Sequence, residues 1–206
     1  MLRINRIIMK KDIILAGVGG QGILSIANTI GIAAIDSGLH LKQAEVHGMS
    51  QRGGDVHSDL RISDKEIASD LIPEGKADMI ISVEPMESLR YLPMLSSDGW
   101  LVTNTTPYVN IPNYPDVESL ISAVKAFPNH IAIDADQIAS DIGQKRSANM
   151  VILGAASLFL GIEYSMLERA ISEIFQSKGE KIVEANIKAL KAGKDYASNY
   201  VKDHQV

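Results

Sequence analysis

The stretch DIILAGVGGQGILSIANTIGIAAIDSG, residues 12–38, joins an apolar run of strand length, a glycine-rich turn and a helical pattern. Residues 12–17 predict a buried strand. Residues 19–37 predict a helix that Gly38 ends in the position after the C-cap. Such a strand–turn–helix unit is typical of Rossmann-like proteins. The sequence therefore predicts an α/β fold that begins with a Rossmann-like βα unit.

The rest of the chain alternates apolar runs of strand length with longer helical patterns. Residues 41–48 and 55–63 predict two strands whose short polar connection cannot hold a parallel crossover. These strands are either antiparallel neighbours or members of different pairings, so the sheet should be mixed. Further strands are predicted at residues 77–84, 99–104 and 130–135. The expected architecture is three-layer α/β/α with a mixed sheet.

Helical patterns separate the later strands and make up the C-terminal end of the chain. One helix should begin at Pro85, because proline is favoured at the first helical position. Residues 105–115 contain three prolines and predict an extended surface excursion or a lid. A helix near residues 116–126 should follow, and the chain should end in three helices at residues 147–162, 165–176 and 180–198.

Composition and length fit one well-packed domain, since the chain has 206 residues of which 46% are hydrophobic. We expect a leader at residues 1–10, a single domain at residues 11–200 and a tail at residues 201–206. Cysteine is absent from the sequence. This chain therefore cannot form disulfides, thiolate zinc sites, a cysteine nucleophile or cysteine-ligated iron–sulfur clusters.

The N-terminal apolar runs are too short for a signal peptide, and no run in the sequence reaches transmembrane length. These features favour a cytoplasmic protein. The net charge is −5, so no basic field favours nucleic acid or an anionic membrane surface. We therefore expect neither nucleic acid nor a membrane among its partners.

Gly17, Gly19 and Gly22 match the pattern G-x-G-x-x-G between a predicted strand and a predicted helix. Such a loop directs backbone N–H groups and the positive end of a helix dipole towards an anion. Glu45 stands near the place of the ribose-binding acid of a dinucleotide site, but a polar turn follows it instead of a second crossover helix. Three interpretations stay open: a dinucleotide site, another anionic ligand or substrate channel, and a turn where glycine only permits close packing.

A second polar segment, EVHGMSQRGGDVHSDLRIS, spans residues 45–63 and combines charged side chains with three glycines. Polar residues this dense at the ends of two strands predict a binding loop on a rigid sheet. Arg52 is the leading candidate, because a guanidinium suits a carboxylate or phosphate. The alternative is a surface arginine that pairs with Glu45 or Asp55.

Strand alternation places Glu45 and His47 on one face of their strand, and Asp55 and His57 on one face of the next. If these strands pair, the two histidines would lie near each other. A metal site is not expected here, because such alternating polar residues are more often a solvated face. Ser50 is not expected to be a nucleophile, because GMSQRG departs from the G-x-S-x-G elbow.

A third candidate is GQKRSANMVILGA, residues 143–155, where Lys145 and Arg146 precede Ser147, a good N-cap. Two cations at a helix N-terminus suit a phosphate of a large cofactor. An ordinary capped helix with two solvated bases explains the pattern equally well. Asn149 lies in the first turn of this apolar helix and is expected to hold the neighbouring loop in place.

The segments ILAGVGGQGILSIANTIGIAA, EVHGMSQRGGDVHSDLRIS and SANMVILGA occur in this order before a helical tail. Together they resemble the gamma domain of 2-oxoacid:ferredoxin oxidoreductases over roughly residues 11–200. Within that family they are most similar to the small beta subunit of indolepyruvate oxidoreductase, a thiamine-dependent complex. The motif HGMSQRGG carries the assignment to this branch.

The resemblance implies a division of labour between subunits. A larger partner would carry thiamine diphosphate, magnesium and the iron–sulfur clusters, and this chain would complete the active-site cavity and help receive coenzyme A. The complex would decarboxylate an aryl pyruvate oxidatively to an acyl-coenzyme A and reduce ferredoxin. The chain itself would bind no cofactor alone, since its only Gly-Asp pair, Gly54–Asp55, lacks the G-D-G pattern for a magnesium diphosphate. A homodimer is a possible state of the isolated chain.

The resemblance also implies roles for single residues. Arg52 would be an anion clamp and His47 a proton or hydrogen-bond partner, both in support of catalysis. No metal ligand is assigned. The glycine loop would line the cavity or the partner interface, and the candidate binding residues are Gly17, Gly19, Gly20, Gln21, Gly22, Ser50, Gln51, Gly53, Lys145, Arg146 and Asn149.

Two other functions remain as alternatives. The first is a freestanding protein that binds NAD or FAD with its G-x-G-x-x-G loop. The second is a regulatory module that binds coenzyme A through Lys145 and Arg146. The sequence does not identify the 2-oxoacid, the stoichiometry of a complex or the face that docks the partner.

Overall fold

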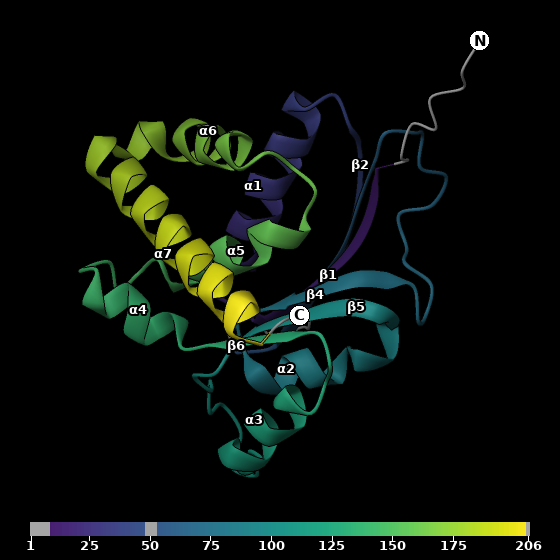
Figure 1. The fold of residues 1–206 in the computed structure, drawn as a ribbon, viewed down its shortest axis with the longest axis vertical. Coiled ribbons are helices and arrows are strands. Elements are labelled where there is room, and N and C mark those ends of the chain that lie inside the picture. The colour runs from purple at the N-terminus through teal and green to yellow at the C-terminus, as the bar shows by residue number, and fades with distance from the viewer. Residues whose placement is uncertain (1–8, 48–52, 205–206) are drawn as a thin grey trace.

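The fold is a six-stranded mixed sheet with helices on both faces, seen in a computed structural model that describes residues 9–47 and 53–204 (Figure 1). The strand order is β2-β3-β1-β4-β5-β6. β1, β4, β5 and β6 are parallel neighbours, whereas β3 runs antiparallel to both β1 and β2. The strand bounds are β1 (Lys10–Val18), β2 (His40–His47), β3 (Asp55–Ser63), β4 (Ala77–Ser82), β5 (Leu95–Asn104) and β6 (His130–Ile133).

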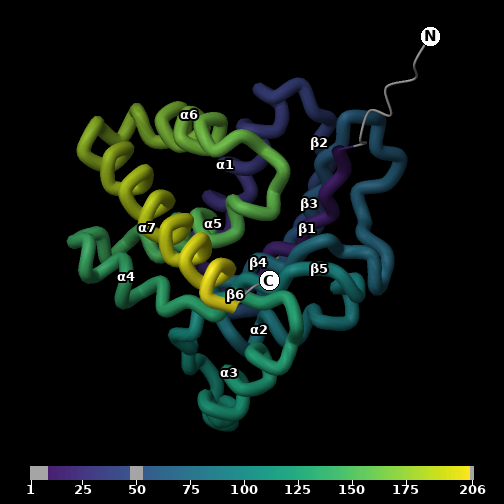
Figure 2. The backbone as a smooth tube through the Cα atoms, viewed as in Figure 1, coloured from purple at the N-terminus to yellow at the C-terminus, as the bar shows by residue number. Residues whose placement is uncertain are grey.

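Helices cover the sheet in two layers, which confirms the predicted three-layer α/β/α architecture (Figures 1 and 2). One face carries α1, α5, α6 and α7, with α4 packed against α5 and α7, and the other face carries α2 and α3. The bounds are α1 (Ile23–Asp36), α2 (Pro85–Arg90), α3 (Val117–Lys125), α4 (Ala135–Asp141), α5 (Ala148–Ala156), α6 (Tyr164–Phe175) and α7 (Glu180–His204), with 3₁₀ turns at Leu92–Met94, Ser157–Phe159 and Gln176–Lys178.

The central strand β1 explains how the two layers form. Ile13 and Leu15 belong to the core under α1 and α5, whereas Ile14 belongs to the core under α2 and α3. All three side chains are fully buried. Successive side chains of a strand point to opposite faces, so a strand covered on both sides needs a continuous apolar run. The run DIILAG meets this requirement and fixes the layers on each side of it.

Helix α1 ends as the sequence predicts. Gly38 adopts a left-handed backbone with φ of 74°. Its N–H bonds the Ile35 carbonyl at 2.9 Å, and the Leu39 N–H bonds the Ala34 carbonyl at 3.0 Å. This pair of bonds is the Schellman motif, which glycine permits without strain. The chain can therefore turn directly from α1 into the edge strand β2.

Strand β5 begins at Leu95, earlier than the predicted start at residue 99. The segment SSDG, residues 96–99, has the composition of a turn but is an irregularity inside the strand. The pairing with β4 shifts there, since Ala77 pairs with Leu95 and Met79 pairs with Trp100. A segment with the composition of a turn can thus form a bulge inside a strand, because the strand pairs with its neighbour again after the segment.

Helix α7 runs to His204, beyond the predicted end at residue 198. Its last turns continue because they dock on β6: the Tyr196 hydroxyl donates to the Ala132 carbonyl at 3.0 Å, and the Tyr200 hydroxyl lies 2.7 Å from His130 Nε2. Within the described residues, neither α7 nor any other helix is long and apolar enough to cross a membrane.

Helices α5 and α7 cross at backbone contact distance. A Cβ on Gly154 would lie 1.9 Å from the Leu190 carbonyl oxygen, and a Cβ on Gly193 would lie 1.9 Å from the Val151 carbonyl oxygen. Both glycines are therefore required by close packing. The predicted helix 147–162 is too long, since α5 ends at Ala156 and a 3₁₀ turn follows it.

Candidate functional site

The glycine loop lies where ligands bind in open α/β sheets. β1 and β4 are parallel neighbours, and the chain leaves them towards opposite faces, into α1 and α2 respectively (Figure 1). The crevice outside such a switch point is the usual ligand position in this architecture. A ligand site is therefore expected at the carboxyl end of β1.

A tight turn connects β1 to α1. Gly20 and Gly22 have φ of 101° and 84°, a backbone that other residues rarely adopt. Gln21 closes the turn, because its N–H bonds the Val18 carbonyl at 3.1 Å and its side-chain oxygen accepts the Val18 N–H at 2.8 Å. These two bonds lie within the loop and stabilise its turn.

Two glycines of the motif are required by packing. A Cβ on Gly17 would lie 2.4 Å from Val83 Cγ2, and a Cβ on Gly22 would lie 2.6 Å from Asn149 Nδ2. Asn149 also donates from Nδ2 to the Gly22 carbonyl at 3.2 Å. The Asn149 side chain therefore holds the glycine loop, which is distant in the sequence. These contacts support the packing interpretation of the motif for Gly17 and Gly22.

The two glycine-containing motifs meet at this edge of the sheet. The Gly19 N–H bonds the Gly54 carbonyl at 2.9 Å, and the Gly53 N–H bonds the Gly19 carbonyl at 3.4 Å. These bonds extend the β1–β3 ladder past the ends of both strands. The candidates Ser50, Gln51 and Arg52 lie outside the described residues. The described part of their segment is adjacent to the glycine loop.

The prediction that the two histidines would lie near each other across paired strands is wrong. β2 and β3 do pair, but His47 stands opposite Val56, and His57 stands opposite Val46. Directly opposed residues share a face of the sheet, and neighbours along a strand alternate. The one-residue offset therefore puts the two histidine positions on opposite faces.

Asp55 and His57 face a common partner on the α2 side of the sheet. The Tyr91 hydroxyl lies 3.0 Å from the Asp55 carboxylate and 2.8 Å from His57 Nδ1. Burial and the nearby Asp55 carboxylate raise the pKa of Tyr91, so the phenol stays a donor at neutral pH. Glu87 lies close by, and burial raises its pKa although its bond to Arg90 opposes this. This cluster fixes the start of β3.

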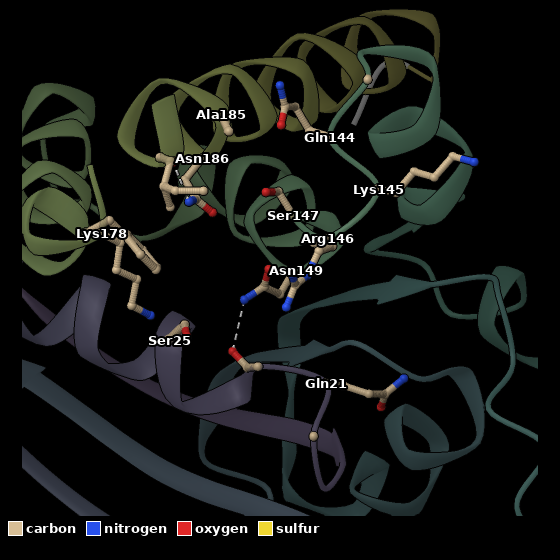
Figure 3. Close-up of a pocket in the computed structure, with 15 residues that line it drawn as sticks. Gln21, Ser25, Gln144, Lys145, Arg146, Ser147, Asn149, Lys178, Ala185 and Asn186 are labelled. Carbon is tan, nitrogen blue, oxygen red and sulfur yellow. Dashed lines mark hydrogen bonds between the residues drawn. The ribbon is translucent and has the colours of Figure 1, made fainter. Parts of the chain in front are cut away.

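A cleft in the described part of the structure brings the first and third sequence candidates together. Its volume is about 870 Å³. The glycine loop and the first turn of α1 form one wall, and the start of α5 with the loop before it forms another (Figure 3). The polar residues that line it are Gln21, Ser25, Gln144, Lys145, Arg146, Ser147, Asn149, Lys178 and Asn186.

The electrostatic character of this cleft favours an anion. Lys145, Arg146 and Lys178 line it, and none of the described residues that line it is an aspartate or glutamate. In the described part of the chain none of these three cations forms an ion pair with a carboxylate. The N-terminal turns of α1 and α5 add the positive ends of two helix dipoles. The arrangement can accept phosphate groups.

The structure differs from the sequence prediction at two residues of the cleft, Lys178 and Ser147. Lys178 reaches into the cleft from the 3₁₀ turn that follows α6, towards the side formed by Ser25 (Figure 3). It was not predicted, because no local pattern places a turn at residues 176–178 beside α1. Ser147 occupies the N-cap of α5 as predicted, but its side chain accepts no hydrogen bond from the first turn.

A smaller pocket of about 190 Å³ adjoins the cleft. Gly20, Gln21, Lys145, Arg146 and Asn149 line both, so the loop before α5 separates the two spaces. The pocket continues along the carboxyl ends of β4 and β5 to Asn104 and Asp136, whose side chains bond at 2.7 Å. The glycine loop is therefore the shared rim of both spaces.

Comparison with known proteins identifies the family. Residues 12–196 match the model described as pyruvate ferredoxin/flavodoxin oxidoreductase. Indolepyruvate oxidoreductase subunit IorB of Archaeoglobus fulgidus is 38% identical over 92% of this chain and 96% of its own length. Subunit IorB of Pyrococcus horikoshii is 37% identical, over 88% and 93%. The chain therefore belongs to the pyruvate ferredoxin/flavodoxin oxidoreductase family, as a subunit of a 2-oxoacid:ferredoxin oxidoreductase.

Solved structures share the fold. The 2-oxoglutarate:ferredoxin oxidoreductase of Magnetococcus marinus, with 2-oxoglutarate, coenzyme A and succinyl-CoA bound, aligns with a TM-score of 0.73 and 24% identity over 92% of this chain and 31% of that chain. Pyruvate oxidoreductase subunit PORC of Thermotoga maritima aligns with 0.69 and 23% identity over 90% and 96%. These relatives give no support to a freestanding NAD- or FAD-binding protein.

Proposed function

We propose that this chain is the non-cofactor subunit of a thiamine-diphosphate-dependent oxidoreductase that acts on aryl pyruvates such as indolepyruvate. The main support for this proposal is the similarity of the chain to IorB subunits over nearly the full length of both chains. The complex would convert the 2-oxoacid and coenzyme A into carbon dioxide and an acyl-coenzyme A, and would pass two electrons to ferredoxin. We place it in the cytoplasm.

The redox cofactors belong to a larger partner subunit in this proposal. The sequence contains no cysteine, so the chain has no thiolate ligands for an iron–sulfur cluster. Asp55 of the Gly54–Asp55 pair directs its carboxylate to the Tyr91 hydroxyl. Within the described residues, this Gly-Asp pair therefore does not fit a site for magnesium and thiamine diphosphate. Such groups would supply carbanion stabilisation and electron storage, and the protein would supply position and electrostatics.

The cleft beside the glycine loop is the proposed place for the phosphates of coenzyme A. Lys145, Arg146 and Lys178 supply the positive charge. Charge-assisted hydrogen bonds to phosphate are among the stronger contacts in proteins, and arginine binds it with two donors. Backbone groups of the glycine loop and the first turn of α1 line the same space. The backbone N–H groups and the positive end of the α1 helix dipole would orient the anion.

His47 and Arg52 remain supporting residues in this proposal. β2 ends at His47, and Gly53 pairs with Gly19 at the start of the glycine loop. The described residues on either side of the segment that contains Arg52, His47 and Gly53, therefore lie at this edge of the sheet. A guanidinium there would clamp a carboxylate or a phosphate. His47 would exchange a hydrogen bond or a proton with the bound 2-oxoacid.

Subunit omission tests this function. The larger subunit is assayed with and without this chain, with coenzyme A, ferredoxin and a panel of 2-oxoacids. We expect turnover only when both subunits are present, because each lacks part of the cavity. We also expect kcat/KM for indolepyruvate to exceed that for pyruvate by about tenfold or more, since the aryl group buries more apolar surface. Full activity of the larger subunit alone would contradict the proposal, as would equal kcat/KM for the two acids.

A further inference from the structure

Residues 105–115, named here the strap, connect β5 to α3 along the carboxyl edge of the sheet. The strap contains neither helix nor strand, and it exposes the side chains of Tyr108, Val109 and Ile111. The predicted excursion is therefore present. A segment of this composition would ordinarily be only loosely held, but two sets of hydrogen bonds fix the strap to the site.

The first set is centred on Glu84, which follows β4 and is completely buried. One carboxylate oxygen accepts the Glu87 N–H at 2.8 Å and so caps α2. The other oxygen accepts the Tyr108 N–H at 3.2 Å and the Tyr114 hydroxyl. Burial and the Glu84 carboxylate raise the pKa of Tyr114, which keeps this phenol protonated as a donor. The strap is therefore anchored at both of its tyrosines.

The second set links the strap to the glycine loop. Asn110 lies between the two anchored tyrosines, and its Nδ2 donates to the Gly53 carbonyl at 2.6 Å. Gly53 in turn donates its N–H to the Gly19 carbonyl, and Gly19 donates to Gly54. Gly19 is directly followed by the residues that form the rim of the cleft. Hydrogen bonds joined by short backbone segments thus connect Glu84 to the rim.

We propose that Asn110 is a positioning residue: from the anchored strap it holds Gly53, and through Gly53 it holds the glycine loop in the geometry that shapes the cleft. An amide suits this role because only a donor can bond the Gly53 carbonyl. The catalytic consequence rests on the proposed function, whereas the structural role does not. Glu84 acts one step further away, because it fixes the strap that carries Asn110.

Amide hydrogen exchange of the full chain, measured by NMR without partner or substrate, tests the structural role. Asn110→Asp keeps the size of the side chain and removes the donor. We expect the Gly19 and Gly53 amides to exchange about fivefold faster or more, as loss of one hydrogen bond implies. Asn129→Asp is the matched control, because Asn129 donates in the same way to the distant Asp98 carbonyl. It should leave both glycine amides unchanged.

Kinetics of the assembled complex test the consequence for the site. We expect Asn110→Asp to raise the KM for coenzyme A about threefold or more with kcat within about twofold, because the cleft is misshapen but the chemistry is untouched. Asn110→Gln, which still carries a donor, should restore part of the loss. Unchanged exchange at Gly19 and Gly53 in Asn110→Asp would overturn the positioning role. Faster exchange with an unchanged KM would overturn the link to the cleft, whereas an inactive wild-type complex would instead refute the proposed function.

Discussion

Gly154→Ala is expected to lower the free energy of unfolding by about 2–4 kcal/mol, which places it among the more damaging core substitutions. The added Cβ would lie 1.9 Å from the Leu190 carbonyl oxygen and 3.0 Å from the Lys194 nitrogen. Both are backbone atoms of α7, so relief requires the helices to separate. Alanine favours a helix over glycine by about 1 kcal/mol, which is too little to offset this clash. Urea denaturation followed by circular dichroism measures the change.

Gly31→Ala is the matched control for this prediction. Gly31 also lies buried inside a helix, α1, but its Cβ would meet only Leu41 Cδ2, at 3.1 Å. The end of a leucine side chain can move, so the change in stability should stay within about 1 kcal/mol. If Gly154→Ala proves as mild as Gly31→Ala, then the backbone contact between α5 and α7 does not hold the C-terminal layer together.

The second large effect concerns the cleft. Lys145→Glu combined with Arg146→Glu is expected to raise the KM of the assembled complex for coenzyme A about 100-fold or more. A hydrogen bond to a charged group is worth about 1.5–3 kcal/mol, and 1.4 kcal/mol corresponds to a factor of ten. The reversal also introduces repulsion in a cleft whose described lining residues include no acidic side chain. The dependence of initial rate on coenzyme A concentration measures the effect.

A charge-matched variant separates this effect from a general change in net charge. Lys76→Glu with Lys125→Glu alters the net charge by the same amount, and neither lysine lines the cleft or the smaller pocket beside it. This control should leave the KM for coenzyme A within about twofold of the wild type, since distant surface charges are screened. An equal rise of the KM for coenzyme A in both double variants would show that the cleft does not bind coenzyme A.

The parts of the fold with strong local signals were predictable from the sequence. The apolar run of β1 and the left-handed Gly38 each act through neighbouring residues, and both are as predicted. The extent of β5 was not predictable, because the SSDG segment has the composition of a turn and becomes a bulge only through its pairing with β4. The final turns of α7 likewise depend on contacts with β6 that are distant in the sequence.

The sequence predicts the separate segments of the candidate site but not that they lie together. The glycine loop and the Lys145–Arg146 pair were each found as possible anion sites, and the structure places them on one cleft. Their meeting depends on how α1 and α5 pack, which no local pattern encodes. For the same reason Lys178 and Asn110 gave no signal. The supposed histidine pair failed because the strand register, offset by one residue, decides which side chains share a face.

The central claim is that this polypeptide works only together with a subunit that carries the cofactors. The most direct test measures iron, thiamine diphosphate and 2-oxoacid-dependent dye reduction, first for the purified chain alone and then after the larger subunit is added. We expect no iron, no thiamine diphosphate and no dye reduction for the chain alone. The assembled complex should contain iron and thiamine diphosphate and should reduce the dye. Dye reduction by the isolated chain would contradict the central claim.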